Sequence, residues 1–174
     1  FTGTSLSEQS FDFKMTDVTG KQEIKFLLET DNGSNDTYVH SYELYYIGDI
    51  PETPTAKPTV APTAAPTAKP TAAPTAKPTA TADPTPVISA KPTATAAPQL
   101  VSNGECSTMT HGGQYAGPSD KLGFSAMAFY VNGDYCSTSY TFAGTNKKYR
   151  MVVKGASDNS STASVSVYIG GKKV

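Results

Sequence analysis

Residues 51–99 consist almost wholly of proline, threonine and alanine, and this run limits the fold more than any other feature of the 174-residue sequence. From Pro54 to Pro78 a proline recurs every four residues. Proline fixes φ near about −65° and removes a backbone donor, so neither a helix nor a sheet extends through such a run. Large apolar side chains are almost absent, so no core offsets the entropy of ordering. We therefore expect 51–99 to be a disordered, extended linker between a first flank, 1–50, and a second flank, 100–174.

The two flanks are expected to fold together. Each is short, and a piece of about 50 residues buries too little surface to fold well alone. The first flank carries nine acidic residues against three lysines, whereas the second carries four acidic residues against seven lysines and arginines. These opposite charges favour a weak, salt-dependent association of the flanks.

Composition also excludes several partners. No basic cluster is interleaved with aromatics, as a nucleic-acid site requires, and no apolar run approaches the roughly 20 residues of a membrane span.

The sequence shows no signal peptide and begins at Phe1, which we expect to lie in a strand, so we predict a piece of a longer, secreted, extracellular protein. Cys106 and Cys136 are the only cysteines, and a disulfide and two buried thiols both stay open at this point.

Strand patterns dominate both flanks. In the first, Ile24, Phe26 and Leu28 alternate with polar residues, which predicts a half-buried strand, and a tyrosine-rich second strand follows at 38–47. In the second, short apolar or alternating segments are separated by turn residues, at 124–130, 135–142, 149–154 and 165–169, with a loop at 155–164. We predict an all-β fold, a β-sandwich or jelly roll built from both flanks and split by the linker, without a helix.

The loop between the first two predicted strands is rich in oxygen ligands. It contains Asp31, Asn32, Asn35 and Asp36, with Gly33 among them. Calcium takes about six to eight oxygens, and carboxylates, amides and backbone carbonyls supply them. The spacing is not that of an EF-hand, and the same residue types dominate plain hairpin turns. The residues alone therefore leave both a calcium site and a simple turn open.

Catalytic patterns are weak. Gly-x-Ser-x-Gly is absent, and His40 and His111 are isolated from one another and from any metal-ligand spacing. A glycosidase needs two carboxylates at a set separation, which composition does not reveal. The ten tyrosines suit sheet packing as well as sugar stacking.

A series of segments outside the linker carries a family resemblance. The second flank reads Gly-Gly-Gln-Tyr-Ala-Gly at 112–117, Ala-Phe-Tyr-Val-Asn-Gly-Asp-Tyr at 128–135, Lys-Gly-Ala-Ser at 154–157, Ser-Thr-Ala at 161–163 and Tyr-Ile-Gly-Gly at 168–171. The first flank reads Phe-Thr-Gly at 1–3, Gly-Lys-Gln-Glu-Ile-Lys at 20–25 and then the Asp-rich loop at 31–36. In these segments the sequence resembles the family 36 carbohydrate-binding modules, small β-jelly-rolls that bind xylan through calcium.

The resemblance implies an unusual order. Residues 1–50 are similar to the carboxyl half of such a module and 100–174 to its amino half. Either the piece spans the end of one tandem module and the start of the next, or it is a permuted module, as the related family 60 looks like a permutant of family 36. We expect the halves to complete one jelly roll, as a monomer or as a dimer that exchanges halves.

The resemblance also implies a site. Carried over by position, Asp31 and Asp36 are the carboxylate ligands of a calcium ion, Asn32 and the Asn35 carbonyl are further ligands, and Tyr115 lines the sugar cleft. The family has a tryptophan where Asn35 stands, so the stacking surface is smaller here.

A second, structural calcium of the family uses acids near its first and last strands. Glu105 matches that pattern, but Ser107 and His40 replace the other acids, which puts this site in doubt. The resemblance also places Cys106 and Cys136 on strands that can be neighbours, which favours a disulfide.

These observations predict a non-catalytic, calcium-dependent module that binds xylan or another β-linked plant polysaccharide and targets a secreted hydrolase to the plant cell wall. A structural or adhesion β-domain of a cell-surface protein, without sugar binding, is the alternative. A catalytic glycosidase fragment is the third and least favoured interpretation.

Overall fold

The structure, a computed structural model, describes residues 1–29, 36–51, 96–158 and 162–174, and these residues are almost entirely β-strand and turn. The elements are β1 (Ser7–Met15), β2 (Gly20–Leu27), β3 (Thr37–Asp49), β4 (Gln99–Glu105), a 3-10 turn η1 (Cys106–Thr108), β5 (Thr110–Gly112), β6 (Gly117–Ser119), β7 (Ala126–Phe129), β8 (Tyr135–Phe142), β9 (Lys147–Ser157), β10 (Ser166–Ile169) and β11 (Lys172–Lys173).

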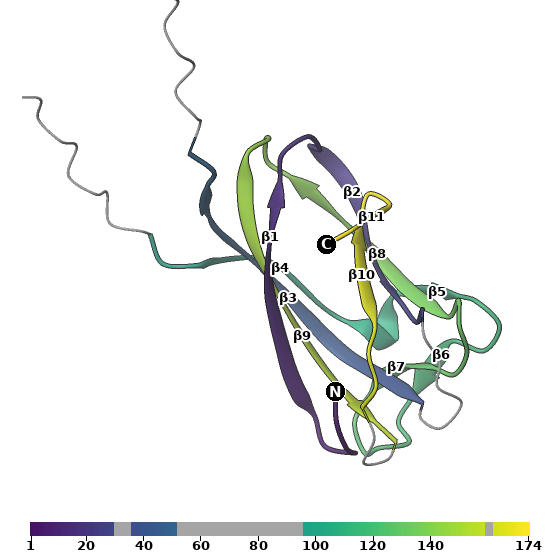
Figure 1. Ribbon diagram of the computed structural model, residues 1–174. Helices are drawn as coiled ribbons and strands as arrows, with labels where there is room; N and C mark the ends of the chain where they lie inside the picture. The colour runs from purple at the N-terminus through teal and green to yellow at the C-terminus, as the bar shows by residue number, and fades with distance from the viewer. Residues whose placement is uncertain (30–35, 52–95, 159–161) are drawn as a thin grey trace, which may run out of the picture. The chain divides into compact units, whose positions relative to one another are not determined.

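The strands form two antiparallel sheets packed face to face (Figure 1). The first sheet has the order β1-β9-β3-β7-β6, and β4 also pairs with β3. The second has the order β11-β10-β2-β8-β5. The predicted all-β sandwich is therefore confirmed.

The two flanks interleave in both sheets. In the first sheet β9, from the second flank, lies between β1 and β3 of the first flank, with Met151 opposite Phe11 on one side and Leu44 on the other. In the second sheet β2, from the first flank, lies between β8 and β10 of the second, with Phe26 opposite Cys136 and Val167. Described strands of both flanks belong to one compact unit.

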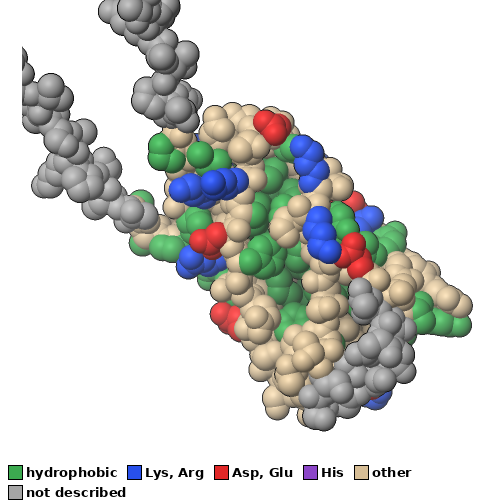
Figure 2. All heavy atoms as spheres, viewed as in Figure 1, with side chains coloured by type: hydrophobic (Ala, Val, Ile, Leu, Met, Phe, Trp, Pro, Cys, Tyr) green, Lys and Arg blue, Asp and Glu red, His purple; other side chains and the backbone are tan. Residues whose placement is uncertain are grey.

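The core follows from the period-two pattern of the strands. In β2, Ile24 and Phe26 are fully buried between the sheets, while Lys25 between them lies on the opposite face and is half-buried. Phe142 of β8 packs edge-on against Tyr149 of β9, with ring centroids 5.1 Å apart. In the space-filling view, hydrophobic side chains are visible along the gap between β1 and β10 (Figure 2), where a hollow is lined by Phe11 and neighbouring apolar residues.

Opposite charges of the two flanks meet along the strand pairs. Arg150 of β9 donates to both carboxylate oxygens of Asp12 on β1, at 2.7 and 3.0 Å, and Lys147 pairs with Asp49 of β3. These pairs are largely exposed, and exposed ion pairs contribute little individually. The charge complementarity expected from the sequence is present, but burial between the sheets supplies most of the stability.

Three strand limits differ from the sequence expectation. Phe1 does not lie in a strand: Thr2 makes one isolated bridge with Thr162, and β1 begins only at Ser7. The expected loop at 155–164 starts later, because residues 155–157 extend β9 by pairing with the beginning of β3. Strand β4 begins at Gln99, the last residue of the expected linker.

Glycine at position 155 allows the end of β9 to approach β3 closely. A Cβ atom there would lie 2.5 Å from the Tyr38 carbonyl oxygen and 2.6 Å from the Phe1 ring.

The described residues contain no candidate for a membrane-spanning helix.

The strand order predicts that neither flank folds alone but that the two complement each other. Produced separately, residues 1–50 keep none of their strand pairs, and residues 96–174 keep only β5–β8, β6–β7 and β10–β11. Each fragment is therefore expected to show a largely disordered circular-dichroism spectrum. Mixing them should restore a β-sheet spectrum and a one-to-one complex by size-exclusion chromatography with light scattering.

A second fragment carrying Met151→Asp is the control for this experiment. Met151 is fully buried in the strand that joins the flanks, and an unpaired charge there should prevent complementation. A first flank that folds without its partner would contradict the prediction.

Candidate functional site

The connection between β2 and β3, which belong to different sheets, is held at both ends by the second flank. At the end of β2, Leu28 donates to the Asp134 carbonyl and Gly133 donates to the Leu28 carbonyl, both at 2.9 Å. At the start of β3, the Asp36 amide donates to the Asp158 carboxylate at 3.0 Å, and the Asp158 amide donates to the Asp36 carbonyl at 3.3 Å. The predicted calcium loop therefore leaves and rejoins the sandwich at two fixed points.

The predicted ligands divide into two groups. Asp31, Asn32 and Asn35 lie outside the described residues, so their placement as ligands stays a prediction. Asp36 is described and lies at the β3 end of the loop, and Tyr115 is described and 58% exposed.

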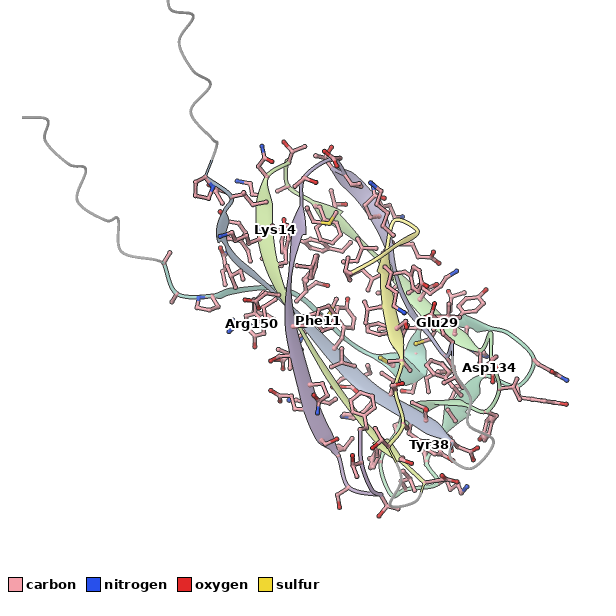
Figure 3. The ribbon with its side chains drawn as sticks, in the orientation of Figure 1. Phe11, Lys14, Glu29, Tyr38, Asp134 and Arg150 are labelled. Atoms are coloured by element: carbon pink, nitrogen blue, oxygen red, sulfur yellow. The ribbon has the colours of Figure 1, made fainter. Side chains whose placement is uncertain are left out.

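Glu29 fixes the β2 end of the loop further. Its carboxylate accepts hydrogen bonds from Ser166, Tyr168 and Lys173 of β10 and β11. The Lys173 ammonium, followed by the two hydroxyls, lowers the pKa of Glu29 to about 2. Figure 3 shows Glu29, Asp134 and Tyr38 toward the same end of the sandwich.

Two carboxylates and one ammonium meet beside the β3 end of the loop. Lys121 Nζ lies 3.6 Å from Asp36 Oδ2 and 3.5 Å from Asp158 Oδ2. Burial, and then the negative charge of Asp158, raise the pKa of Asp36, while Lys121 acts in the opposite direction. The two carboxylates thus repel each other, and this repulsion favours a cation between them. The exposed Lys121 ammonium neutralises part of their negative charge.

Tyr38 lies under this group of charges. Its ring is buried, its hydroxyl is 3.5 Å from Asp36 Oδ2, and Lys121 Nζ lies 5.9 Å from the ring centroid. Burial raises the pKa of Tyr38 to about 12, so the phenol stays neutral and remains a hydrogen-bond donor.

Asp134 is the buried carboxylate that organises the surrounding loops. Its Oδ1 accepts from the Gln114 and Tyr115 amides at 2.8 and 3.0 Å, and its Oδ2 accepts from the Tyr130 and Val131 amides at 2.9 and 3.2 Å. Burial acts to raise the pKa of Asp134, but the four backbone donors outweigh it and the pKa is lowered.

Glycine at position 113 allows this close approach. Its φ is +108°, and a Cβ atom there would lie 2.5 Å from Asp134 Oδ1. The Gly-Gly-Gln-Tyr segment therefore wraps over the Asp134 carboxylate, which connects the backbone of Tyr115 to the residue that also anchors Leu28.

Glu105, the predicted ligand of a second calcium ion, lies beside the imidazole of His40. His40 Nδ1 lies 3.4 Å from Glu105 Oε2 and 2.6 Å from the Ser125 carbonyl oxygen. Within the described residues no group of three or more His, Cys, Asp or Glu side chains is arranged to hold a metal. The second calcium site stays a prediction.

Cys106 and Cys136 are both buried and both free thiols, from η1 and β8. A hydrogen bond between the two, followed by burial, raises the pKa of Cys106. The sequence left a disulfide and two buried thiols open, and the structure has the thiols in contact.

Sequence reasoning missed three residues of this region. Asp158 and Lys121 carried no motif, because each lies far from the Asp-rich loop in the sequence. Asp134 lies among the turn residues between two predicted strands, 124–130 and 135–142, and a turn residue alone gives no signal for this role. The signal was the Gly-Gly pair at 112–113, which allows backbone amides to surround the Asp134 carboxylate.

Replacing Asp134 is expected to destabilise the fold. In Asp134→Asn one amide oxygen replaces two charged acceptors and the NH₂ group opposes backbone donors, so we expect a loss of about 2–4 kcal/mol in urea denaturation. Asp17→Asn, an exposed carboxylate in the turn between β1 and β2, is the control and should change little.

The same variant should alter the pH dependence of stability. The pKa of Asp134 in the folded state is below its ordinary value of 3.8, so its contribution is present above about pH 3.8 and is lost as the pH falls through the folded pKa. The stability difference between the parent and Asp134→Asn should therefore shrink on acidification. A difference that stays constant to the lowest pH of a two-state transition would contradict the assignment.

Comparison with known proteins gives one informative similarity. The chain matches no protein-family profile, and no solved structure is significantly similar to it. Over 74 residues, which is 42% of the chain, it is 40% identical to an arabinoxylan arabinofuranohydrolase of Paenibacillus polymyxa. The match spans only 11% of that relative's length.

Proposed function

We propose that this chain is a non-catalytic carbohydrate-binding module that recognises xylan or a related β-linked plant polysaccharide through calcium. The observation that carries the proposal is the convergence of Asp36 and Asp158 beside an oxygen-rich loop, at the end of the sandwich where Asp134 also anchors the exposed Tyr115.

The residues present suit a hard cation. Asp36 and Asp158 offer carboxylate oxygens of the kind calcium prefers, and their mutual repulsion would be relieved by a divalent ion. When bound, calcium supplies coordination positions that two adjacent sugar hydroxyls can fill. Asp36 and Asp158 would hold the cation in place of Lys121, which now lies beside both carboxylates, and the exposed Tyr115 would present its ring to the sugar.

The relative supports the choice of polysaccharide. Its name is that of an enzyme acting on arabinoxylan, and the matching region is a small part of its length. A binding module attached to a larger, secreted hydrolase is the arrangement that fits such a partial match. From this relative we extend to the chain only the substrate class, a xylan-type polysaccharide, and we propose an extracellular location because plant cell-wall polysaccharides lie outside cells.

We further propose that the two flanks are the halves of one family 36-like module in permuted order. The insertion of β9 between β1 and β3, and of β2 between β8 and β10, supports this arrangement. Light scattering on the intact chain distinguishes a monomer from a dimer that exchanges halves.

The direct test is affinity electrophoresis in gels containing soluble xylan, with calcium or with EDTA. We expect calcium-dependent retardation, which Asp36→Ala reduces at least about tenfold in apparent affinity because it removes a charged cation ligand. Asp17→Ala is the matched control and should migrate like the parent.

The other outcomes distinguish the remaining functions. Absence of retardation by xylan in calcium would favour a structural or adhesion domain. Release of reducing sugar from xylan would favour a catalytic fragment. Unchanged retardation of Asp36→Ala, with its fold intact by circular dichroism, would refute the site.

Lys121 gives an independent prediction about the cation. Because its ammonium competes for the same carboxylates, Lys121→Gln should bind calcium several-fold more tightly by isothermal titration calorimetry at low salt. Lys148→Gln, near the opposite end of β9 from Asp158, should bind as the parent does. Unchanged or weaker binding by Lys121→Gln would contradict a cation held between Asp36 and Asp158.

A further inference from the structure

One side of the sandwich is left open between β4 and β8. Strand β4 pairs with β3 along one edge only, and β8 is covered by β5 only from Tyr135 to Ser137. Among the described strands, none pairs with the other edge of β4 or with that edge of β8 beyond Ser137. A hollow of about 590 Å³ lies between these two edges, within the range of about 300–1,000 Å³ typical of ligand sites.

The lining of this hollow is polar and rich in hydroxyls. Its polar side chains come from β2, β4, η1, β5 and β8 and include Glu23, Asn103, Glu105, Thr110, Thr138 and Ser139. A carboxylate can accept hydrogen bonds from two adjacent hydroxyls, and a side-chain amide can accept from one hydroxyl and donate to the next. Serine and threonine hydroxyls act as both donors and acceptors. This set suits a ligand that carries many hydroxyl groups.

A second hollow of about 240 Å³ continues along the same two strands. There β4 contributes Gln99 and Val101, four and two residues before Asn103, and β8 contributes Tyr140, two residues after Thr138. Two more tyrosine rings line this hollow, those of Tyr46 and Tyr149, which lie 5.9 Å apart in an edge-to-face arrangement. The open side thus has a hydroxyl-rich part followed by an aromatic part.

We propose that this open side, the β4–β8 groove, is a second carbohydrate site that binds a stretch of neutral, β-linked glycan without calcium. Glu23 and Glu105 disfavour an anionic ligand such as an acidic glycan or a nucleic acid. The hydroxyl-rich part provides hydrogen bonds to sugar hydroxyls, and the half-buried rings of Tyr46 and Tyr140, backed by the buried Tyr149, provide an apolar surface for the faces of the sugar rings. None of the groove residues belongs to the Asp36, Asp158 and Lys121 cluster.

The open strand edges also raise the question of a peptide that adds as a strand. Strand addition obtains specificity from pockets for alternate side chains, which are usually apolar in part. In the hydroxyl-rich part, Tyr42 and Met109 are the large apolar residues of the lining, and Tyr42 is itself buried. The lining therefore favours a sugar over a peptide.

This inference goes beyond the calcium-dependent site and does not need it. Two sites on one module can engage the same polysaccharide, so that binding at one raises the effective concentration at the other. The groove would then supply weak retention on the polymer, and the calcium site would add the metal-dependent part.

The experiment is an amide-resolved NMR titration of the intact chain with xylohexaose and, separately, cellohexaose, in EDTA. We expect at least one of the sugars to shift the amide signals of Asn103, Thr138 and Ser139. The same sugar should shift these signals equally in the Asp36→Ala variant. No shift of these amides with either sugar at its highest soluble concentration would overturn the proposal. So would shifts of the same amides that depend on protein concentration alone, since they would assign the open edges to pairing between two copies.

Matched variants make the assignment specific. Glu23→Gln and Asn103→Ala should each weaken the EDTA-resistant binding about fivefold. Glu8→Gln is the control, because Glu8 on β1 is similarly exposed and paired with one lysine at a similar distance, 3.6 Å against 3.7 Å for Glu23. Equal effects of Glu8→Gln and Glu23→Gln would overturn the proposal. If Asp36→Ala loses only the calcium-dependent binding and keeps the EDTA-resistant binding, the groove proposal is supported. The two proposed sites can therefore be refuted independently of one another.

Discussion

The hydrogen bonding of β9 to strands on both of its sides is the interaction on which the rest of the structure depends. Its neighbours β1 and β3 come from the other flank, so the central strand of the first sheet is supplied across the long proline-rich run. A strand paired on both sides and covered on one face by a second sheet is largely buried, and Met151 at its centre is fully so. The sandwich therefore exists only when both flanks contribute to it.

The same dependence extends to the candidate site. The loop that bears the predicted ligands belongs to the first flank, but Asp134, Asp158 and Lys121, which anchor its ends or neutralise its charge, belong to the second. The oxygen-rich loop alone had the composition of an ordinary turn. What favours a cation is a carboxylate from more than 100 residues away placed opposite Asp36, which only the assembled sandwich provides.

The sequence predicted the fold better than the site, for a physical reason. Alternation of apolar and polar residues, as at Ile24 and Phe26, is a local property that a period-two pattern reveals directly. The pairing of β9 with β1 and β3 is non-local and follows from no pattern, and the extension of β9 past residue 155 depends on its partner strand. Asp158 and Lys121 were missed because an isolated charge carries no signal until the fold brings another charge to it.

The two ends of the predicted loop are fixed by different contacts, and this difference indicates which end the proposed cation would stabilise. The β2 end is fixed by the Leu28 hydrogen bonds, by the four donors to Asp134 and by the cluster around Glu29, none of which involves the Asp36 cluster. The β3 end is fixed by one pair of hydrogen bonds and by an exposed lysine that screens two repelling carboxylates. A cation that binds only the folded state adds stability in proportion to its affinity, and that stabilisation acts at the β3 end. The β2 end, with Tyr115 attached through Asp134, makes none of these contacts through the Asp36 cluster, so we expect it to stay in place with or without the proposed cation. If the proposed function holds, Asp36, Asp158 and Lys121 would set the cation affinity, while Asp134 would maintain the geometry that the sugar meets.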